Sequence, residues 1–116
     1  MMEWLIIALL AVFLFYSMRK GPTKGVKSIT TSELASMLND PNKVFIDVRT
    51  PGEFAGKRIQ QFKNIPLGGD LSQLPHDKEI VVICQSGMRS VQACKQLKQL
   101  GYKKIVNVKG GMSAWS

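Results

Sequence analysis

One stretch, residues 80–100, constrains the fold of this chain more than any other. Ile80–Ile83 is an uninterrupted apolar run of the kind that forms a buried strand. A short polar loop follows from Cys84, and the amphipathic pattern of Val91–Leu100 then predicts a helix that ends at Gly101. In α/β sheets, ligands bind where parallel strands reach their carboxyl ends. The pattern therefore places a cysteine where such sheets form their binding sites.

The loop after this strand can activate the cysteine. Backbone N–H groups in a strand-to-helix loop can converge on one point, and the helix dipole adds to their preference for an anion. A thiol placed there ionises more easily than a free one, and thiolate is the reactive form. We therefore interpret Cys84 as a nucleophile. The alternative is a buried small hydrophobic residue, which is the common position of an intracellular cysteine.

The rest of the loop consists of Gln85, Ser86, Gly87, Met88, Arg89 and Ser90. Gly87 is typical of an ordinary tight turn, and it also suits the positive φ that an anion-binding loop requires. Ser90 is placed either to cap the following helix or to form a hydrogen bond with the sulfur. Arg89 could be a surface residue of the first helical turn. The residues alone leave these alternatives open.

The spacing from Cys84 to Arg89 is C-x4-R, a loop of six residues. Here the sequence resembles the rhodanese (sulfurtransferase) family, whose active loop has the same length, whereas the related cysteine phosphatases have one residue more. That longer ring is wide enough for phosphate, and the shorter one suits the outer sulfur of a persulfide. The resemblance covers roughly residues 29–116 and includes three further segments: Val44–Phe54, Asn64–Leu67 and Gly110–Trp115.

The resemblance implies a mechanism. Cys84 would attack the outer sulfur of a small anionic donor such as thiosulfate and carry it as a persulfide. Backbone N–H groups from Gln85 to Ser90 would stabilise that sulfur, and Arg89 would bind the donor or steady the loop. A thiol acceptor, or cyanide in vitro, would then remove it. Such a reaction needs no general base if the thiol is already ionised.

Three residues are expected to border the pocket. Asp47 and Arg49 end a predicted strand at the same sheet edge as Cys84, and Arg49 could pair with Glu53 across the following turn. Arg58 begins the segment Arg58–Lys63, which stands where many family members carry a histidine-isoleucine-proline-glycine-alanine-like sequence. We therefore expect a different shape and charge beside the active loop.

Two other reactive side chains are expected to be structural. Cys94 is ten residues beyond Cys84, about 15 Å along a helix, and the Cα limit for a disulfide is about 7 Å. It shares an apolar stripe with Val91 and Leu97, so we expect it in the core. His76 lies in a polar turn and is expected to be solvated. No metal-ligand spacing, P-loop or dinucleotide fingerprint occurs, and we expect no metal and no cofactor.

The amino-terminal segment has a separate character. Residues Trp4–Met18 carry no charge and would span about 22 Å as a helix, against a hydrocarbon core of about 30 Å. A cleaved signal peptide would have basic residues ahead of such a run, but Glu3 is the only charged side chain there. We predict one transmembrane helix over residues 1–20, which anchors the chain in a membrane.

The charges that follow this segment predict its orientation. Arg19 and Lys20 come directly after the apolar run, so the positive-inside rule places the carboxyl-terminal domain in the cytoplasm. Gly21–Gly25 interrupts the helix and, with the residues up to 28, is expected to be a linker. We therefore divide the chain into an anchor (1–20), a linker (21–28) and one domain (29–116).

Charge also bears on partners. All sixteen Lys and Arg residues follow position 18, together with seven of the eight acids, so this part has a net charge of +9. A surface of this kind attracts anionic lipid headgroups and anionic sulfur donors, although most of these lysines are expected to be plain solvated surface. Basic residues do not alternate with evidently exposed aromatic residues, so we expect no nucleic-acid partner.

Beyond residue 28 the sequence alternates between strand and helix patterns. We expect helices or helical turns at 30–38, 51–55, 71–74 and 91–100, and strands at 44–47, 65–67, 80–83 and 105–108. Thr30 and Glu33 form a capping box at the first helix. Alternation of this type predicts an α/β fold with a small, mostly parallel sheet and helices on both faces.

These expectations lead to one function and two rivals. The first is a membrane-anchored sulfurtransferase of the rhodanese type, which acts through a Cys84 persulfide. The second is a non-enzymatic module that relays sulfur to a neighbouring membrane protein or senses redox state for it. The third, a cysteine phosphatase, is disfavoured by the six-residue loop.

Overall fold

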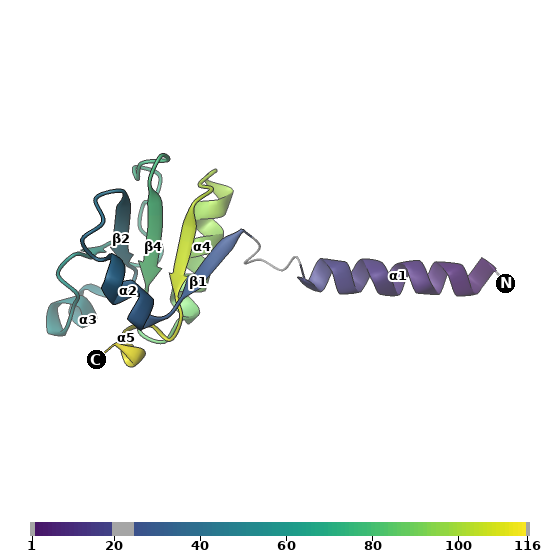
Figure 1. Cartoon of the computed structure of the whole chain (residues 1–116), viewed down its shortest axis with the longest axis horizontal. Helices are drawn as coiled ribbons and strands as arrows, with labels where there is room; N and C mark the ends of the chain where they lie inside the picture. The colour runs from purple at the N-terminus through teal and green to yellow at the C-terminus, as the bar shows by residue number, and fades with distance from the viewer. Residues whose placement is uncertain (1, 20–24, 116) are drawn as a thin grey trace.

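The computed structural model describes residues 2–19 and 25–115. A helix, α1 (Met2–Arg19), precedes a domain in which strands and helices alternate (Figure 1). In chain order the domain contains β1 (Val26–Ile29), α2 (Thr31–Met37), β2 (Lys43–Asp47), α3 (Pro51–Gly56), β3 (Lys63–Asn64), β4 (Glu79–Ile83), α4 (Met88–Gln99), β5 (Ile105–Val108) and α5 (Gly111–Ala114).

The strands form one parallel sheet in the order β1-β5-β4-β2-β3. In the central strand β4, Val81 lies opposite Phe45 of β2 on one side and Val106 of β5 on the other. Helix α2 lies in front of the sheet and α4 behind it (Figure 1). The predicted α/β fold, with a parallel sheet and flanking helices, is confirmed.

The alternation of side chains along the strands divides the core into two clusters. Ile80 and Val82 of β4 pack in the cluster that contains α4, whereas Val81 and Ile83 pack in the cluster that contains α2. All four side chains are fully buried because helices cover both faces of the sheet, and this explains the uninterrupted apolar run. Cys84 continues the alternation and belongs to the cluster of α4.

Capping boxes start two of the helices. At α2, the Thr30 hydroxyl accepts a hydrogen bond from the Glu33 N–H (3.1 Å), and the Glu33 carboxylate accepts one from the Thr30 N–H (3.2 Å). The same pair of contacts joins Thr50 and Glu53 at α3. The first box was predicted; the second has the same threonine-to-glutamate spacing and was identifiable from it.

Three local predictions require correction. The strand predicted at 65–67 lies at Lys63–Asn64, although the N–H groups of Ile65 and Leu67 still donate to the carbonyls of Asp47 and Val48 (2.9 and 3.1 Å). Residues 71–74 form a hydrogen-bonded turn in place of a helical turn. The linker predicted over 21–28 is too long, because Val26–Ile29 is an edge strand paired with β5. Its two central residues are exposed, so its sequence lacks the apolar run of a buried strand.

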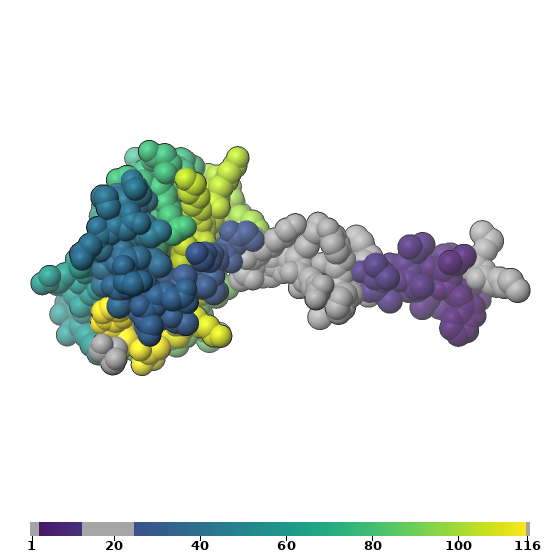
Figure 2. Space-filling model, in the orientation of Figure 1, coloured from purple at the N-terminus to yellow at the C-terminus, as the bar shows by residue number. Residues whose placement is uncertain are grey.

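Helix α1 has side chains that the domain does not cover. Residues 3–12 are all exposed (Figure 2), and Trp4, Leu9 and Val12 expose 79%, 68% and 65% of their surface. The predicted transmembrane anchor is nevertheless not supported: within residues 2–19 and 25–115, no helix has both the length and the apolar character needed to cross a membrane. Residues 1 and 20 of the predicted anchor and residues 21–24 of the predicted linker lie outside the described part of the chain.

Candidate active site

The segment from Cys84 to Ser90 connects β4 to α4 at the carboxyl edge of the sheet. Helix α4 begins at Met88, three residues earlier than predicted, and Gly87 precedes it with a φ of 105°. Only glycine adopts this left-handed conformation without strain, which allows the chain to turn directly from the loop into the helix. The predicted positive φ at Gly87 is confirmed.

Two groups of the loop contact the Cys84 sulfur. The Gly87 N–H donates a hydrogen bond to Sγ (2.9 Å), and the Ser90 Oγ lies 3.3 Å from Sγ. Ser90 also donates to the Gly87 carbonyl (3.0 Å) and is fully buried in the first turn of α4. Ser90 is therefore not the cap of the helix. Of the two alternatives left by the sequence, the structure shows the contact with sulfur.

These contacts favour the thiolate. Burial, the largest single influence, raises the pKa of the Cys84 thiol, but hydrogen bonding with the Ser90 hydroxyl and with the N–H groups of Ser90, Gly87 and Ser86 together brings the pKa below its ordinary value of 9.0. The loop thus gives Cys84 the electrostatic environment of a nucleophile. The Cys84 side chain exposes no surface to solvent.

The start of α5 supports the loop from its other side. The Met112 N–H donates to the Cys84 carbonyl (2.8 Å), and the N–H and hydroxyl of Ser113 both donate to the Gln85 carbonyl (2.9 and 2.8 Å). A Cβ added to Gly111 would lie 2.2 Å from the Cys84 carbonyl oxygen, so only glycine permits this approach. Sequence reasoning did not assign a role to Gly111 or Ser113, although the pair Gly110-Gly111 was a visible signal of close packing.

Asp47 and Arg49 form a buried ion pair at the same edge. The Arg49 Nη2 lies 2.8 Å from Asp47 Oδ2, and the two side chains are 2% and 0% exposed. The guanidinium also donates to the Glu53 carbonyl (3.2 Å) and to the Gln85 side chain (3.4 Å), so it connects the scaffold to the active loop. The suggested pairing of Arg49 with the Glu53 carboxylate does not occur.

The Glu53 carboxylate instead binds Arg89. Two hydrogen bonds, of 2.6 and 2.9 Å, join the carboxylate oxygens to the two terminal nitrogens of the guanidinium. Arg89 belongs to the first turn of α4 and Glu53 to α3, so the ion pair connects two helices beside the loop. Next to Arg89, the side chain of Met88 is 78% exposed.

The segment Arg58–Lys63 lies beside α3. The Arg58 guanidinium stacks over the Phe54 ring, 5.2 Å from its centroid. Ile59 and Phe62 are buried in the cluster that contains α2, so two residues of this segment serve the core. Among the described residues, no hydrogen bond or ion pair joins Arg58 to the active loop.

The two residues expected to be structural have structural surroundings. Cys94 is 1% exposed in the core, as predicted, and burial followed by the charge of Cys84 raises its pKa to about 12. It is therefore a thiol at neutral pH. His76 is exposed in its turn and stacks on Tyr102, with the ring centroids 3.9 Å apart.

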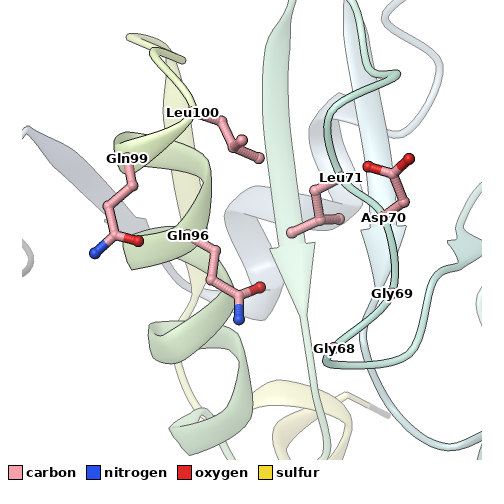
Figure 3. Close-up of a pocket in the computed structure, with 7 residues that line it drawn as sticks. All are labelled: Gly68, Gly69, Asp70, Leu71, Gln96, Gln99 and Leu100. Carbon is pink, nitrogen blue, oxygen red and sulfur yellow. The ribbon is translucent and has the colours of Figure 1, made fainter.

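A separate hollow of about 310 Å³ lies between residues 68–71 and the second half of α4 (Figure 3). Gly68, Gly69, Asp70 and Leu71 line it on one side, and Gln96, Gln99 and Leu100 line it on the other. The side chains that line it come from none of the residues of the active loop. This hollow is therefore distinct from the surroundings of Cys84.

Comparison with known proteins agrees with the site. Residues 30–116 match the family model described as rhodanese-like domain. A sulfurtransferase of Allochromatium vinosum is 37% identical over 95 residues, covering 78% of this chain and 89% of that protein. The putative sulfurtransferase YtwF of Bacillus subtilis is 42% identical over 94 residues, covering 78% and 90%.

A solved structure gives the same result. The crystal structure of a rhodanese-like domain protein from Staphylococcus aureus matches with a TM-score of 0.70 and 36% identity, covering 78% of this chain and 91% of that one. Similarity in sequence and in fold thus extends over almost the whole domain that holds Cys84. The chain belongs to the rhodanese-like family, and its relatives support sulfur transfer as its general chemistry.

Proposed function

We propose that the protein transfers sulfane sulfur from a donor to a thiol acceptor through a persulfide on Cys84. One observation carries the proposal: the Cys84 sulfur sits at the carboxyl end of β4, where Gly87 and Ser90 contact it directly. These contacts favour the thiolate and would equally stabilise the negative terminal sulfur of a persulfide. The relatives named sulfurtransferase support the same reaction.

The reaction has two steps. The Cys84 thiolate attacks the outer sulfur of a donor such as thiosulfate, a new S–S bond forms, and the donor's S–S bond breaks with its electron pair leaving on sulfite. An acceptor thiolate then attacks the terminal sulfur of the persulfide, and Cys84 leaves again as a thiolate. No proton need move in either step because every attacking and leaving sulfur group is anionic.

The test is the intact mass of the full-length chain after incubation with thiosulfate. We expect the mass to rise by one sulfur atom, to return after addition of a reducing thiol, and to stay constant in a Cys84→Ser variant. Sulfite release over many cycles identifies an enzyme. Persulfide formation without turnover would instead support the sulfur-relay module. Equal sulfite release by Cys84→Ser would contradict the mechanism.

We also propose that residues 4–18 hold the domain at a membrane, with the domain on the cytoplasmic side and a membrane protein as a possible partner. Support comes from the absence of charge in this segment, the exposed apolar side chains of α1, and the basic residues Arg19 and Lys20 that follow. Insertion in a bilayer would remove this apolar surface from water.

A further inference from the structure

The charge beside Cys84 is arranged in an unusual way for a site that receives an anion. Arg89 is the only charged residue of the active loop. Its guanidinium is held by the Glu53 carboxylate through two hydrogen bonds of 2.6 and 2.9 Å. The two side chains are 34% and 33% exposed, so the pair lies at the surface of the site. A donor approaching the loop therefore meets an ion pair in place of a free cation.

The other arginines at this edge are also engaged. Arg49 is paired with Asp47 at 2.8 Å and is buried, and Arg58 stacks over Phe54. The Glu53 carboxylate stays ionised at physiological pH because Arg89, followed by the N–H of Thr50, lowers its pKa to about 2. Its negative charge therefore offsets the attraction of Arg89 for an anionic donor.

The remaining surface of the loop is neutral or apolar. Gln85 and Ser86 contribute an amide and a hydroxyl, and the Met88 side chain is 78% exposed. A methionine thioether is flexible and makes favourable contacts with apolar and aromatic groups. Thiosulfate is a dianion. This surface suits an organic group better than it suits the sulfonate end of that ion.

We propose that Glu53 is a specificity-determining residue that disfavours dianionic donors, and that the site prefers singly charged sulfane donors with an apolar organic group. Organic thiosulfonates and organic persulfides have this chemistry. The inference rests on the proposed sulfur transfer and deepens it by naming the donor class. With a thiosulfonate, the Cys84 thiolate takes the outer sulfur, the donor's S–S bond breaks, and its electron pair leaves on an organic sulfinate.

The experiment compares two donors on the full-length chain, thiosulfate and benzenethiosulfonate, by the rate at which Cys84 gains sulfur. For the wild type we expect kcat/KM to be at least about tenfold higher with benzenethiosulfonate. Glu53→Gln should lower KM for thiosulfate by about three- to fivefold with little change in kcat. It should leave KM for benzenethiosulfonate within about twofold.

A charge series separates electrostatics from structure. The wild-type pair has no net charge. Glu53→Gln leaves only the positive charge of Arg89, Arg89→Gln leaves only the negative charge of Glu53, and the double variant again has no net charge. KM for thiosulfate should be lowest in Glu53→Gln, highest in Arg89→Gln, and near the wild-type value in the double variant. High salt should reduce these differences in KM, because dissolved ions screen the charges of a partly exposed pair.

The matched control is Glu33→Gln, which makes the same change in the other capping box, where Glu33 contacts Thr30 and no arginine. It should alter neither donor's KM. Glutamine at Glu53 can still cap α3, so Glu53→Gln is expected to fold. Equal KM changes for both donors in Glu53→Gln, or a double variant that fails to return to the wild-type value, would overturn the inference. If neither donor loads wild-type Cys84, the proposed sulfur transfer itself fails.

Discussion

We expect the reactivity of Cys84 to depend on a few hydrogen bonds that offset its burial. Burial raises the pKa of a thiol, so the contacts from Ser90 and from the backbone N–H groups are what keep the pKa below 9.0. A thiol with a lowered pKa gains its reactive form at a lower pH. The rate of reaction at Cys84 should therefore rise with pH, with its midpoint at a lower pH than for an ordinary thiol.

Ser90→Ala should shift the midpoint of this pH profile to higher pH. The substitution removes the hydroxyl that lies 3.3 Å from the sulfur. The thiolate loses one stabilising contact, so burial raises the pKa of Cys84 with less to offset it. The measurement is the alkylation rate of Cys84 against pH. Cys94, whose pKa is about 12, stays a thiol and does not interfere. Ser36→Ala, which removes an exposed hydroxyl of α2, should leave the profile unchanged. An unchanged or lower midpoint in Ser90→Ala would contradict this role.

The position of the loop between a strand and a helix was predictable from residues alone, but the partners of its side chains were not. Cysteine after a buried strand, with glycine three residues later, indicates an anion-binding loop. Whether Ser90 caps the helix or contacts sulfur depends on where α4 begins, which the structure places at Met88. That Glu53 pairs with Arg89 depends on the approach of α3 to α4, residues that are 36 positions apart.

At the scale of elements, capping and burial patterns were predictable because they are local. The Thr30–Glu33 box and the apolar run of β4 identify their elements directly. The edge strand β1 was missed because two of its four residues are exposed, so it has no apolar run. Its place in the sheet comes from pairing with β5, about 80 residues later.

The contact between the start of α5 and the loop that follows β4 provides a prediction at this scale. Gly111 has a φ of 58°, and a Cβ there would lie 2.2 Å from the Cys84 carbonyl oxygen. Gly111→Ala should destabilise the fold by about 2–4 kcal/mol and slow the loading of Cys84, because α5 must move away from the loop. Urea denaturation and the intact-mass assay measure the two effects.

Gly101→Ala is the matched control for backbone strain. Gly101 also has a positive φ, of 92°, but nothing lies within 4 Å of an added Cβ. Gly101→Ala should lower the free energy of unfolding by only about 1–2 kcal/mol and leave the loading of Cys84 with sulfur unaffected in the folded protein. Equal effects of the two substitutions on sulfur loading would mean that close packing against the loop is unimportant.

At the scale of the whole molecule, the direction of the strands separates the two ends of the domain. Val26 begins β1 and pairs with Ile105 at the start of β5, whereas Cys84 follows the end of the parallel strand β4. Strands of four or five residues, at about 3.3 Å per residue, set these edges roughly 15 Å apart. The chain therefore enters the sheet at the edge opposite the active loop.

This arrangement leads to a prediction about membrane attachment. The full-length chain should sediment with liposomes and stay bound in high salt, because burial of apolar side chains is not screened. A variant that lacks residues 1–20 should remain in the supernatant and load Cys84 from thiosulfate at a rate within about twofold of the full chain. In cells, external protease should leave the domain intact. Full-length protein that stays in solution would exclude the proposed attachment.

Local sequence patterns were sufficient for the α/β class and for the place of Cys84 between a buried strand and a helix, because each depends on neighbouring residues. The partners of charged and polar side chains emerged only from the folded chain. Arg49 pairs with Asp47, Glu53 pairs with Arg89, and Gly111 lies against the loop, since the packing of the helices around the sheet determines which distant groups meet. The spacing of residues along the chain indicates the kind of loop that follows Cys84. The charge beside Cys84 depends on tertiary contacts, because Glu53 and Arg89 meet only in the folded chain.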